Sequence, residues 1–257
     1  MRKFVLLFFL VVTNSIIKGQ TNFVDRAELL GLLEVTGINN NGGGVSFVDY
    51  NGDGWDDITL ATGNNTPVLF YKNIEGVAFV KESLLSDDYN YQTKSVTWID
   101  YDNDGDKDLF LTSNTDGNRL FNKSNSGLVD VTVSSGFVLE NFFTYSVNWG
   151  DVNNDGCLDL YMSNHVLNTS ITNLFYLNNC DGTFTESTIS CGLSNLPALS
   201  FTSGFFDFNN DGWQDLYVAN DKFQENYIYK NNGDGTFSDI GESSGANIIV
   251  DAMSVTV

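Results

Sequence analysis

The chain is poor in proline, histidine, cysteine and basic residues. Its 257 residues include 2 Pro, 1 His and 3 Cys, and 12 Lys+Arg stand against 33 Asp+Glu. The formal net charge of −21 excludes nucleic acid and anionic membranes as main partners, because binding phosphate requires clustered cations. The scarcity of histidine and cysteine disfavours zinc, which prefers nitrogen and sulfur ligands. The acidity itself is compatible with a folded core, because 42% of the residues are hydrophobic.

Long hydrophobic runs are missing as well. The run Phe4 to Val12 is too short to span a bilayer, and we predict no membrane span elsewhere. Because basic Arg2 and Lys3 precede this run and polar residues follow it, residues 1–19 are predicted to be a signal peptide. The alternative is a buried N-terminal strand. A signal peptide implies a secreted or cell-surface protein, with the periplasm as a further possible destination.

Three cysteines are too few for a disulfide framework. Cys180 and Cys191 are close enough in sequence to form a bridge in an oxidising compartment, which would leave Cys157 single. The sequence does not give the distance between their Cα atoms, so the bridge stays an open expectation.

What the chain has is an internal repeat. Four similar acidic segments begin at Asp49, Asp100, Asp151 and Asp207, at intervals of 51, 51 and 56 residues. An aromatic residue stands two positions before each of these aspartates, and alternating apolar residues precede three of them, as expected for a strand with one buried face. We place the extra residues of the third copy near 165–172, between two runs that resemble strands.

Each copy is predicted to form four short strands. Apolar runs follow each acidic segment, and turn sequences such as Asn178 to Gly182 and Asn231 to Gly235 predict hairpins. Four-stranded units at this period are typical of β-propeller blades. We therefore predict an all-β fold, with an N-terminal outer strand and linker over 20–43 and blades over about 44–93, 94–143, 144–199 and 200–251.

Both ends of the repeat region match parts of a blade. Phe23 to Asp25 resembles the predicted fourth strands Phe184 to Glu186 and Phe237 to Asp239, and Ser254 to Val257 resembles the beginning of a first strand. We therefore expect the start of a fifth blade at 252–257 and a fragment of a larger ring, of about seven blades. The alternative is a closed ring of four blades.

The acidic segments follow the pattern Asp-x-Asx-x-Asp-Gly-x-x-Asp. Alternating oxygens in a tightly wound loop converge on one point, and Gly at position six permits the turn. Positions one, three, five and nine supply side-chain ligands, and the residue at position seven supplies its backbone carbonyl. The predicted metal ligands are Asp49, Asn51, Asp53, Trp55 and Asp57; Asp100, Asp102, Asp104, Asp106 and Asp108; Asp151, Asn153, Asp155, Cys157 and Asp159; Asp207, Asn209, Asp211, Trp213 and Asp215.

A ligand set made only of oxygens favours Ca²⁺ over Mg²⁺ and zinc, and we expect about one Ca²⁺ in each of the four loops. Carboxylates about 5 Å apart repel by roughly 3 kcal/mol at an effective dielectric of about 20, which opposes closure of the loop without a cation. An EF-hand is excluded, because its position twelve is a Glu and here it is Leu60, Leu111, Met162 or Val218. The remaining alternative is a set of solvated acidic turns.

Two further segments are characteristic of a known family. They are Asp215 to Asn220 (DLYVAN) and Tyr229 to Phe237 (YKNNGDGTF). Together with the acidic loops, they resemble the FG-GAP/VCBS repeat family, which includes the integrin alpha-chain propeller and proteins of the cartilage-acidic-protein (ASPIC/UnbV) type. The resemblance implies a propeller that holds Ca²⁺ between the first two strands of each blade. The turns 73–76 and 122–127 depart from the family pattern.

The function that these features favour is a secreted, calcium-binding platform that binds or adheres to an extracellular protein or a polysaccharide. The alternatives are a lectin and the catalytic or non-catalytic part of a polysaccharide-active enzyme of lyase type. We expect no enzyme and identify no catalytic residue, because His165 is the only histidine and has no evident partner in the sequence.

Overall fold

The computed structural model describes residues 24–32, 34–38, 42–86, 88–166, 171–194 and 196–256. In these residues the fold is all-β, with four four-stranded antiparallel sheets and one short helix, α1 (Gly241–Ser244). The predicted signal peptide and Phe23 lie outside the described residues. The described part contains no helix with the length and apolar character needed to cross a membrane.

Each sheet is built from four strands that pair in sequence order. The strands of the first two sheets are β1 (Val45–Val48), β2 (Asp57–Leu60), β3 (Leu69–Ile74) and β4 (Ala78–Glu82), then β5 (Thr93–Ile99), β6 (Asp108–Ser113), β7 (Arg119–Ser124) and β8 (Gly127–Asp130). Those of the other two are β9 (Thr144–Gly150), β10 (Asp159–Asn164), β11 (Leu174–Asn178) and β12 (Phe184–Glu186), then β13 (Ser200–Phe206), β14 (Asp215–Asn220), β15 (Tyr227–Asn231) and β16 (Phe237–Asp239). The predicted four-stranded blades are confirmed.

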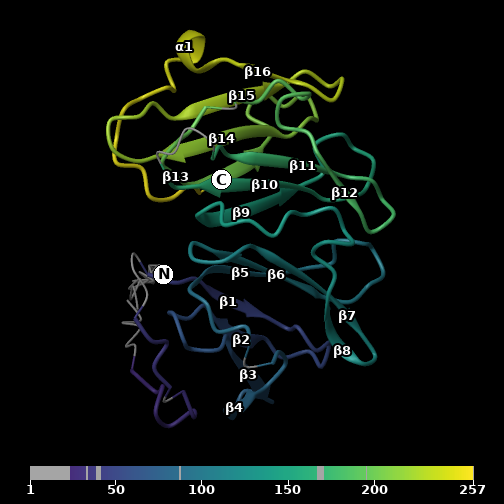
Figure 1. Ribbon diagram of the computed structural model, residues 1–257, viewed down its shortest axis with the longest axis vertical. Coiled ribbons are helices and arrows are strands. Elements are labelled where there is room, and N and C mark those ends of the chain that lie inside the picture. Colours follow the sequence, from purple (N-terminus) through teal and green to yellow (C-terminus); the bar gives the residue numbers. More distant parts are fainter. Residues whose placement is uncertain are drawn as a thin grey trace, which may run out of the picture.

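The sheets follow one another as blades do. Strand β1 contacts β5, β5 contacts β9, and β9 contacts β13, so the first strands of successive sheets are neighbours. Figure 1 shows these strands toward the middle of the molecule, with β4, β8, β12 and β16 toward its edges. The second strands lie between two other strands of their own sheet, and all residues of β6 and β10 are buried.

Three clusters of buried residues fill the spaces between successive sheets. In the first cluster Trp98 of β5 stacks on Tyr50 of the first blade, with ring centroids 4.7 Å apart. The Trp98 indole N–H also donates to the Thr59 hydroxyl of β2 over 2.9 Å. A large side chain from one blade thus fills the space beside the previous blade while its polar atom is satisfied.

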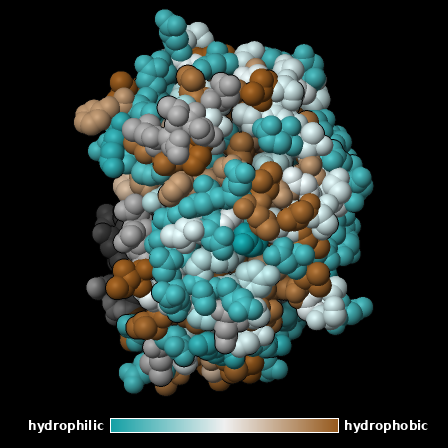
Figure 2. Space-filling view, in the orientation of Figure 1, coloured by the Kyte–Doolittle hydropathy of each residue, from teal (hydrophilic) through white to brown (hydrophobic). Residues whose placement is uncertain are grey.

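The first blade departs from the predicted burial. Val45 and Phe47 were expected on a buried face, but they are 66% and 59% exposed. The alternation predicted correctly that these two side chains lie on one face of β1, but no described segment covers that face. Figure 2 shows that hydrophobic residues on the visible face lie in small groups among hydrophilic ones.

The segment before the first blade makes the same backbone contact as the segments that follow β8 and β12. Val24 to Arg26 form no strand and lead into a turn over 27–31, and residues 252–256 also form no strand. The Phe79 N–H donates to the Leu30 carbonyl over 2.7 Å, as Phe184 does to Ser135 and Phe237 to Cys191. In each case a glycine follows, and a methyl group on Gly31 would lie 2.7 Å from the Phe79 carbonyl. The predicted similarity of these segments therefore appears as a shared contact with the next outer strand.

The two turns that depart from the family pattern still close hairpins. Ile74 pairs with Ala78 between β3 and β4, and Ser124 pairs with Gly127 between β7 and β8. Glu75 and Gly76 supply the positive φ angles, 52° and 74°, in the first of these turns. A turn of different sequence thus gives the same connection.

Candidate metal centre

The four acidic loops connect the first and second strands of each sheet and share one backbone path. The Asp at position one accepts backbone N–H groups from inside its own loop; Asp49, for example, accepts them from Gly52, Asp53 and Gly54 over 2.8, 3.1 and 2.7 Å. Position four is left-handed in every loop, with φ of 78° at Gly52 and 58–60° at Asn103, Asn154 and Asn210. The glycine at position six is left-handed too, at 87–94°. This winding brings the odd-numbered side chains to the inside of the loop.

The Asp at position nine anchors each loop to its sheet. Asp57, Asp108, Asp159 and Asp215 are all 0% exposed. One oxygen accepts the N–H of position two and the other accepts an N–H from the third strand; for Asp159 the donors are Val152 at 3.0 Å and Asn178 at 2.9 Å. Burial raises the pKa of Asp108 and Asp159 to about 7. A cation beside these carboxylates would favour their charged form.

The second loop has the clearest convergence of oxygens. One carboxylate oxygen each from Asp100, Asp102 and Asp108 lies within 4.8 Å of the other two. Oδ1 of Asp100 is buried and accepts no hydrogen bond from any described residue, and the same holds for Oδ1 of Asp106. Buried carboxylate oxygens without donors are costly unless a cation or water satisfies them. The residues of this loop therefore fit a hard divalent cation.

The other three loops have Asn instead of Asp at position three. The side-chain oxygens of Asn51, Asn153 and Asn209 accept the N–H of position five, and that residue's carboxylate accepts the N–H of position seven. The predicted side-chain ligands of these three loops are thus held by the same pattern of hydrogen bonds. A lysine also pairs with position five in two of them: Lys72 with Asp53 at 3.1 Å and Lys230 with Asp211 at 3.8 Å.

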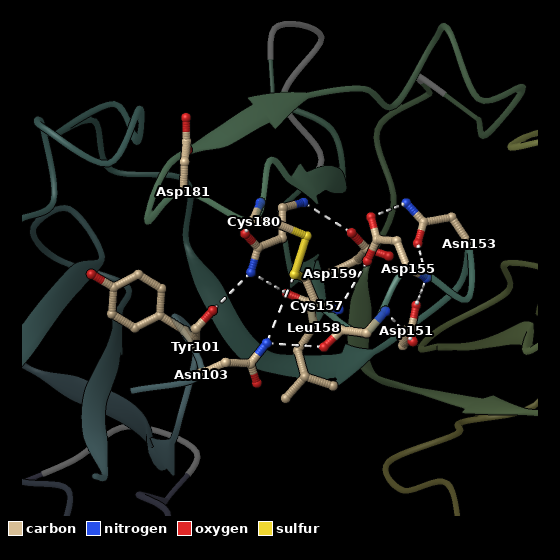
Figure 3. The surroundings of a disulfide bond; sticks show 12 residues. Tyr101, Asn103, Asp151, Asn153, Asp155, Cys157, Leu158, Asp159, Cys180 and Asp181 are labelled. Carbon is tan, nitrogen blue, oxygen red and sulfur yellow. Dashed lines mark hydrogen bonds between the residues drawn. A yellow bond between two sulfur atoms is a disulfide. The ribbon is translucent and has the colours of Figure 1, made fainter. Parts of the chain in front are cut away.

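The side chain at position seven joins each of three loops to the outer hairpin of its own blade. A methyl group on Gly76 would lie 3.0 Å from the Trp55 ring, and one on Gly233 would lie 2.8 Å from Nε1 of Trp213, so these rings cover the hairpin turns. In the third blade the link is covalent, because Cys157 forms a disulfide with Cys180. Figure 3 shows this bond beside Asp155 and Asp159.

The expected bridge between Cys180 and Cys191, with Cys157 single, is wrong. Cys191 is a free, buried cysteine in the core between the third and fourth sheets. Cys180 lies in the turn between β11 and β12, and the hairpin brings this turn to position seven of the loop. Sequence separation favoured Cys191, whereas the folding of the blade determined the partner.

Contacts between blades involve residues to which the sequence assigned at most a place in a hairpin turn. Nδ2 of Asn178 donates to the Tyr101 carbonyl over 2.9 Å, and Nδ2 of Asn231 donates to the Val152 carbonyl over 2.8 Å. In the second blade Nζ of Lys123 donates to the Tyr50 carbonyl over 2.8 Å. Each bond ties a third strand to position two of the preceding loop. The signal in the sequence that could have indicated these contacts is an Asn at the same position of the third and fourth copies.

His165 has a partner that the sequence did not reveal. Its Nε2 lies 3.4 Å from Oδ2 of Asp221, and its ring lies against Phe201 with centroids 4.1 Å apart. Burial lowers the pKa of His165, although Asp221 opposes this shift. The pair joins the third and fourth blades.

Comparison with known families gives the same repeat. The model of the FG-GAP-like repeat matches residues 49–111, 100–162 and 207–257, which together make up well over half of the chain. The chain belongs to the FG-GAP-like repeat family. Its repeats indicate a β-propeller interaction domain, and each of the first two matches spans two successive acidic loops.

A comparison with curated proteins found no match. Among solved structures, an Agrocybe aegerita lectin described as recognising non-reducing terminal N-acetylglucosamine is similar, with 18% identity and a TM-score of 0.46. The match covers 75% of this chain and 49% of the lectin chain, so this FG-GAP-like repeat protein spans about half of that length.

Proposed function

We propose that the chain is a calcium-binding interaction domain in which one Ca²⁺ closes each acidic loop. The observation that carries the proposal is the second loop, where oxygens of Asp100, Asp102 and Asp108 converge within 4.8 Å and Oδ1 of Asp100 is buried without a donor among the described residues. The equivalent residues of the other loops follow the same backbone path. Bound Ca²⁺ would offset the repulsion between these carboxylates and hold the first hairpin of each blade.

Calcium titration of the purified protein tests this proposal. We expect calorimetry to register uptake of about one ion per loop, and the melting temperature to fall markedly in EDTA, because a ligand that binds only the folded state stabilises it. Asp100→Asn should remove binding at one loop while the others continue to fill. Absence of uptake at millimolar calcium, together with an unchanged melt in EDTA, would refute the role.

We also propose that the domain acts outside the cytoplasm, either secreted or at the cell surface. The disulfide between Cys157 and Cys180 fits an oxidising compartment and agrees with the signal peptide predicted over residues 1–19. Expression of the full chain in an exporting host tests this. The exported protein should begin near residue 20, whereas a retained, uncleaved chain would contradict export.

Binding of a glycan, rather than of a protein, is a second candidate that one cavity favours. A cavity of about 210 Å³ is lined by Gly42 to Gly44, Lys94, Tyr145, Phe201 and Met253. Lys94, Tyr145 and Phe201 each stand six residues before the first Asp of a loop, so successive blades present them side by side. Nζ of Lys94 lies 4.9 Å from the centre of the Tyr145 ring, which meets Phe201 edge to face. Aromatic faces beside polar groups suit a sugar ring.

A glycan array distinguishes the two candidates. If the cavity binds sugar, Phe201→Ala should abolish binding, and Phe223→Ala should not, because Phe223 is an aromatic residue with 90% of its surface exposed and is not among the residues that line the cavity. An array without any bound glycan would favour a protein partner. We propose a binding role rather than catalysis, since His165, the one histidine of the sequence, packs against Phe201 and pairs with Asp221 of the next blade.

A further inference from the structure

Successive acidic loops are hydrogen-bonded directly to one another. Nδ2 of Asn103 in the second loop donates to the Gly156 carbonyl of the third loop over 3.0 Å. Nδ2 of Asn154 in the third loop donates to the Gly212 carbonyl of the fourth loop over 3.2 Å. Both bonds join position four of one loop to position six of the next, and Figure 3 shows the first of them.

The left-handed backbone at position four makes this contact possible. It directs the side chain away from the interior of its own loop, and asparagine tolerates the conformation better than most residues. In the first loop position four is Gly52, which has no side chain to reach the second loop. In the fourth loop Asn210 is exposed and donates no hydrogen bond to another loop in the part of the chain that the structure describes.

The acceptor carbonyl belongs to the peptide group that positions the predicted ligands. Because a peptide group is planar, the Gly156 carbonyl and the Cys157 N–H move together. That N–H donates to Oδ1 of Asp155 over 2.9 Å, and the Cys157 carbonyl is itself a predicted ligand. Asn103 in turn stands between Asp102 and Asp104, two ligands of the second loop. A change of either loop on binding an ion therefore moves the bond that joins them.

We propose that Asn103 and Asn154 couple the second, third and fourth loops into one cooperative calcium-binding unit, while the first loop fills independently. This inference rests on the proposed function, because it requires that the loops bind Ca²⁺. The difference between the first loop and the other three does not come from the bonds of Lys123, Asn178 and Asn231. These bonds join loops to third strands, and the Lys123 bond reaches the first loop as well. Coupling is reciprocal, so an ion in either loop of a pair raises the affinity of the other.

Native mass spectrometry during a calcium titration measures this coupling, because it counts the ions on each molecule. For the wild-type protein we expect species with zero, one, three and four ions to exceed their statistical share, and the species with two ions to be depleted. Asn103→Ala should remove the cooperativity between the second and third loops, with a loss of about fivefold in the affinity of the second ion of that pair, as expected for one hydrogen bond. Asn210→Ala is the matched control and should leave the distribution unchanged.

Gly52→Asn provides the reverse test without removing any contact. Gly52 has φ of 78°, and a Cβ there meets nothing within 4 Å. The new side chain should bond to the second loop and bring the first loop into the cooperative unit, so the species with one ion should become depleted. If Asn103→Ala does not fold, this variant decides the question.

The outcomes separate the inference from the function on which it rests. Absence of bound calcium in all variants overturns the proposed function itself. Calcium that binds statistically in the wild-type protein and in Gly52→Asn overturns the coupling and leaves the calcium role intact. Equal loss of cooperativity in Asn103→Ala and Asn210→Ala also overturns it, because of these two residues only Asn103 donates to a neighbouring loop.

Discussion

At the scale of single residues, the four loops differ in the charge next to position five. Lys72 pairs with Asp53 at 3.1 Å, and the hydrogen bond to Asp53 raises the pKa of Lys72. Lys230 holds the same place beside Asp211. In the second blade Asn122 instead donates to Asp102 over 2.8 Å, and in the third blade the equivalent residue is Leu177. In the first and fourth loops a lysine therefore lies where it would compete with the proposed Ca²⁺.

Replacing this lysine should strengthen calcium binding. Lys72→Gln removes a positive charge next to the first loop, and we expect the calcium affinity of this loop to rise about three- to tenfold at low ionic strength. Calorimetric titration measures the change. The control is Lys81→Gln, because Lys81 pairs with Glu34 at 3.2 Å and contacts no acidic loop. An equal gain in both variants would show only an effect of net charge.

At the scale of elements, the residue at position seven joins the acidic loop to the outer hairpin of its blade, and different blades use different chemistry for this. Trp55 and Trp213 cover the turn of the outer hairpin, whereas Cys157 is bonded to it. All three hold the acidic loop against the third and fourth strands of the same blade. The disulfide closes a segment with a sequence separation of 23, so it also restricts the unfolded chain.

Removing the disulfide should destabilise the protein. For Cys157→Ala/Cys180→Ala we expect a loss of about 3 kcal/mol in the free energy of unfolding, from the loop-closure entropy of a segment of this length. Denaturant unfolding measures it. Dithiothreitol should destabilise the wild-type protein and leave the double variant unchanged. A reductant effect of equal size in both proteins would mean that the bridge does not form.

At the scale of the whole molecule, the blades are joined through buried polar contacts as well as apolar packing. Asn178 is 4% exposed, and its Nδ2 donates to the Tyr101 carbonyl of the preceding blade and to the Leu158 carbonyl of its own blade. Asn231 makes the equivalent pair of bonds with Val152 and Gln214. One side chain thus satisfies carbonyls of two blades.

Truncation of such a residue should be costly. Asn178→Ala leaves two carbonyl groups without their donor in a buried place, and we expect a loss of about 2–4 kcal/mol in the free energy of unfolding. Asn179→Ala is the control in the same turn, because Asn179 is exposed and its bond to Thr183 stays within the turn. The control should lose less than about 1 kcal/mol. Similar losses in the two variants would contradict the importance of the contact between blades.

The sequence predicted those features that depend only on residues close together in the chain. The alternation before Asp100 and Asp151 and the recurrent turns gave the strands of each blade, because each strand pairs with its neighbour in the sequence. Four loops with the same oxygen pattern gave the candidate ligands for the same reason. The spacing of Asp, Asn and Gly within one loop is enough to set its path.

Features that depend on contacts between distant segments were not predictable in this way. The bridge to Cys191, which the sequence left open, does not form, because the hairpin and not the sequence separation determines which cysteine Cys180 meets. The pair of His165 and Asp221 joins residues 56 positions apart. The exposure of Phe47 depends on what covers the first sheet, which a pattern along the chain does not contain.

The direction of the contacts between blades has a consequence for biosynthesis. Lys123, Asn178 and Asn231 each reach back to a loop made 73, 77 or 79 residues earlier. A ribosome adds about 5–20 residues per second, so each loop waits roughly 4–16 s for its last donor to be translated. During that interval a newly made blade has an unfinished edge on the nascent chain, and every added blade completes the one before it.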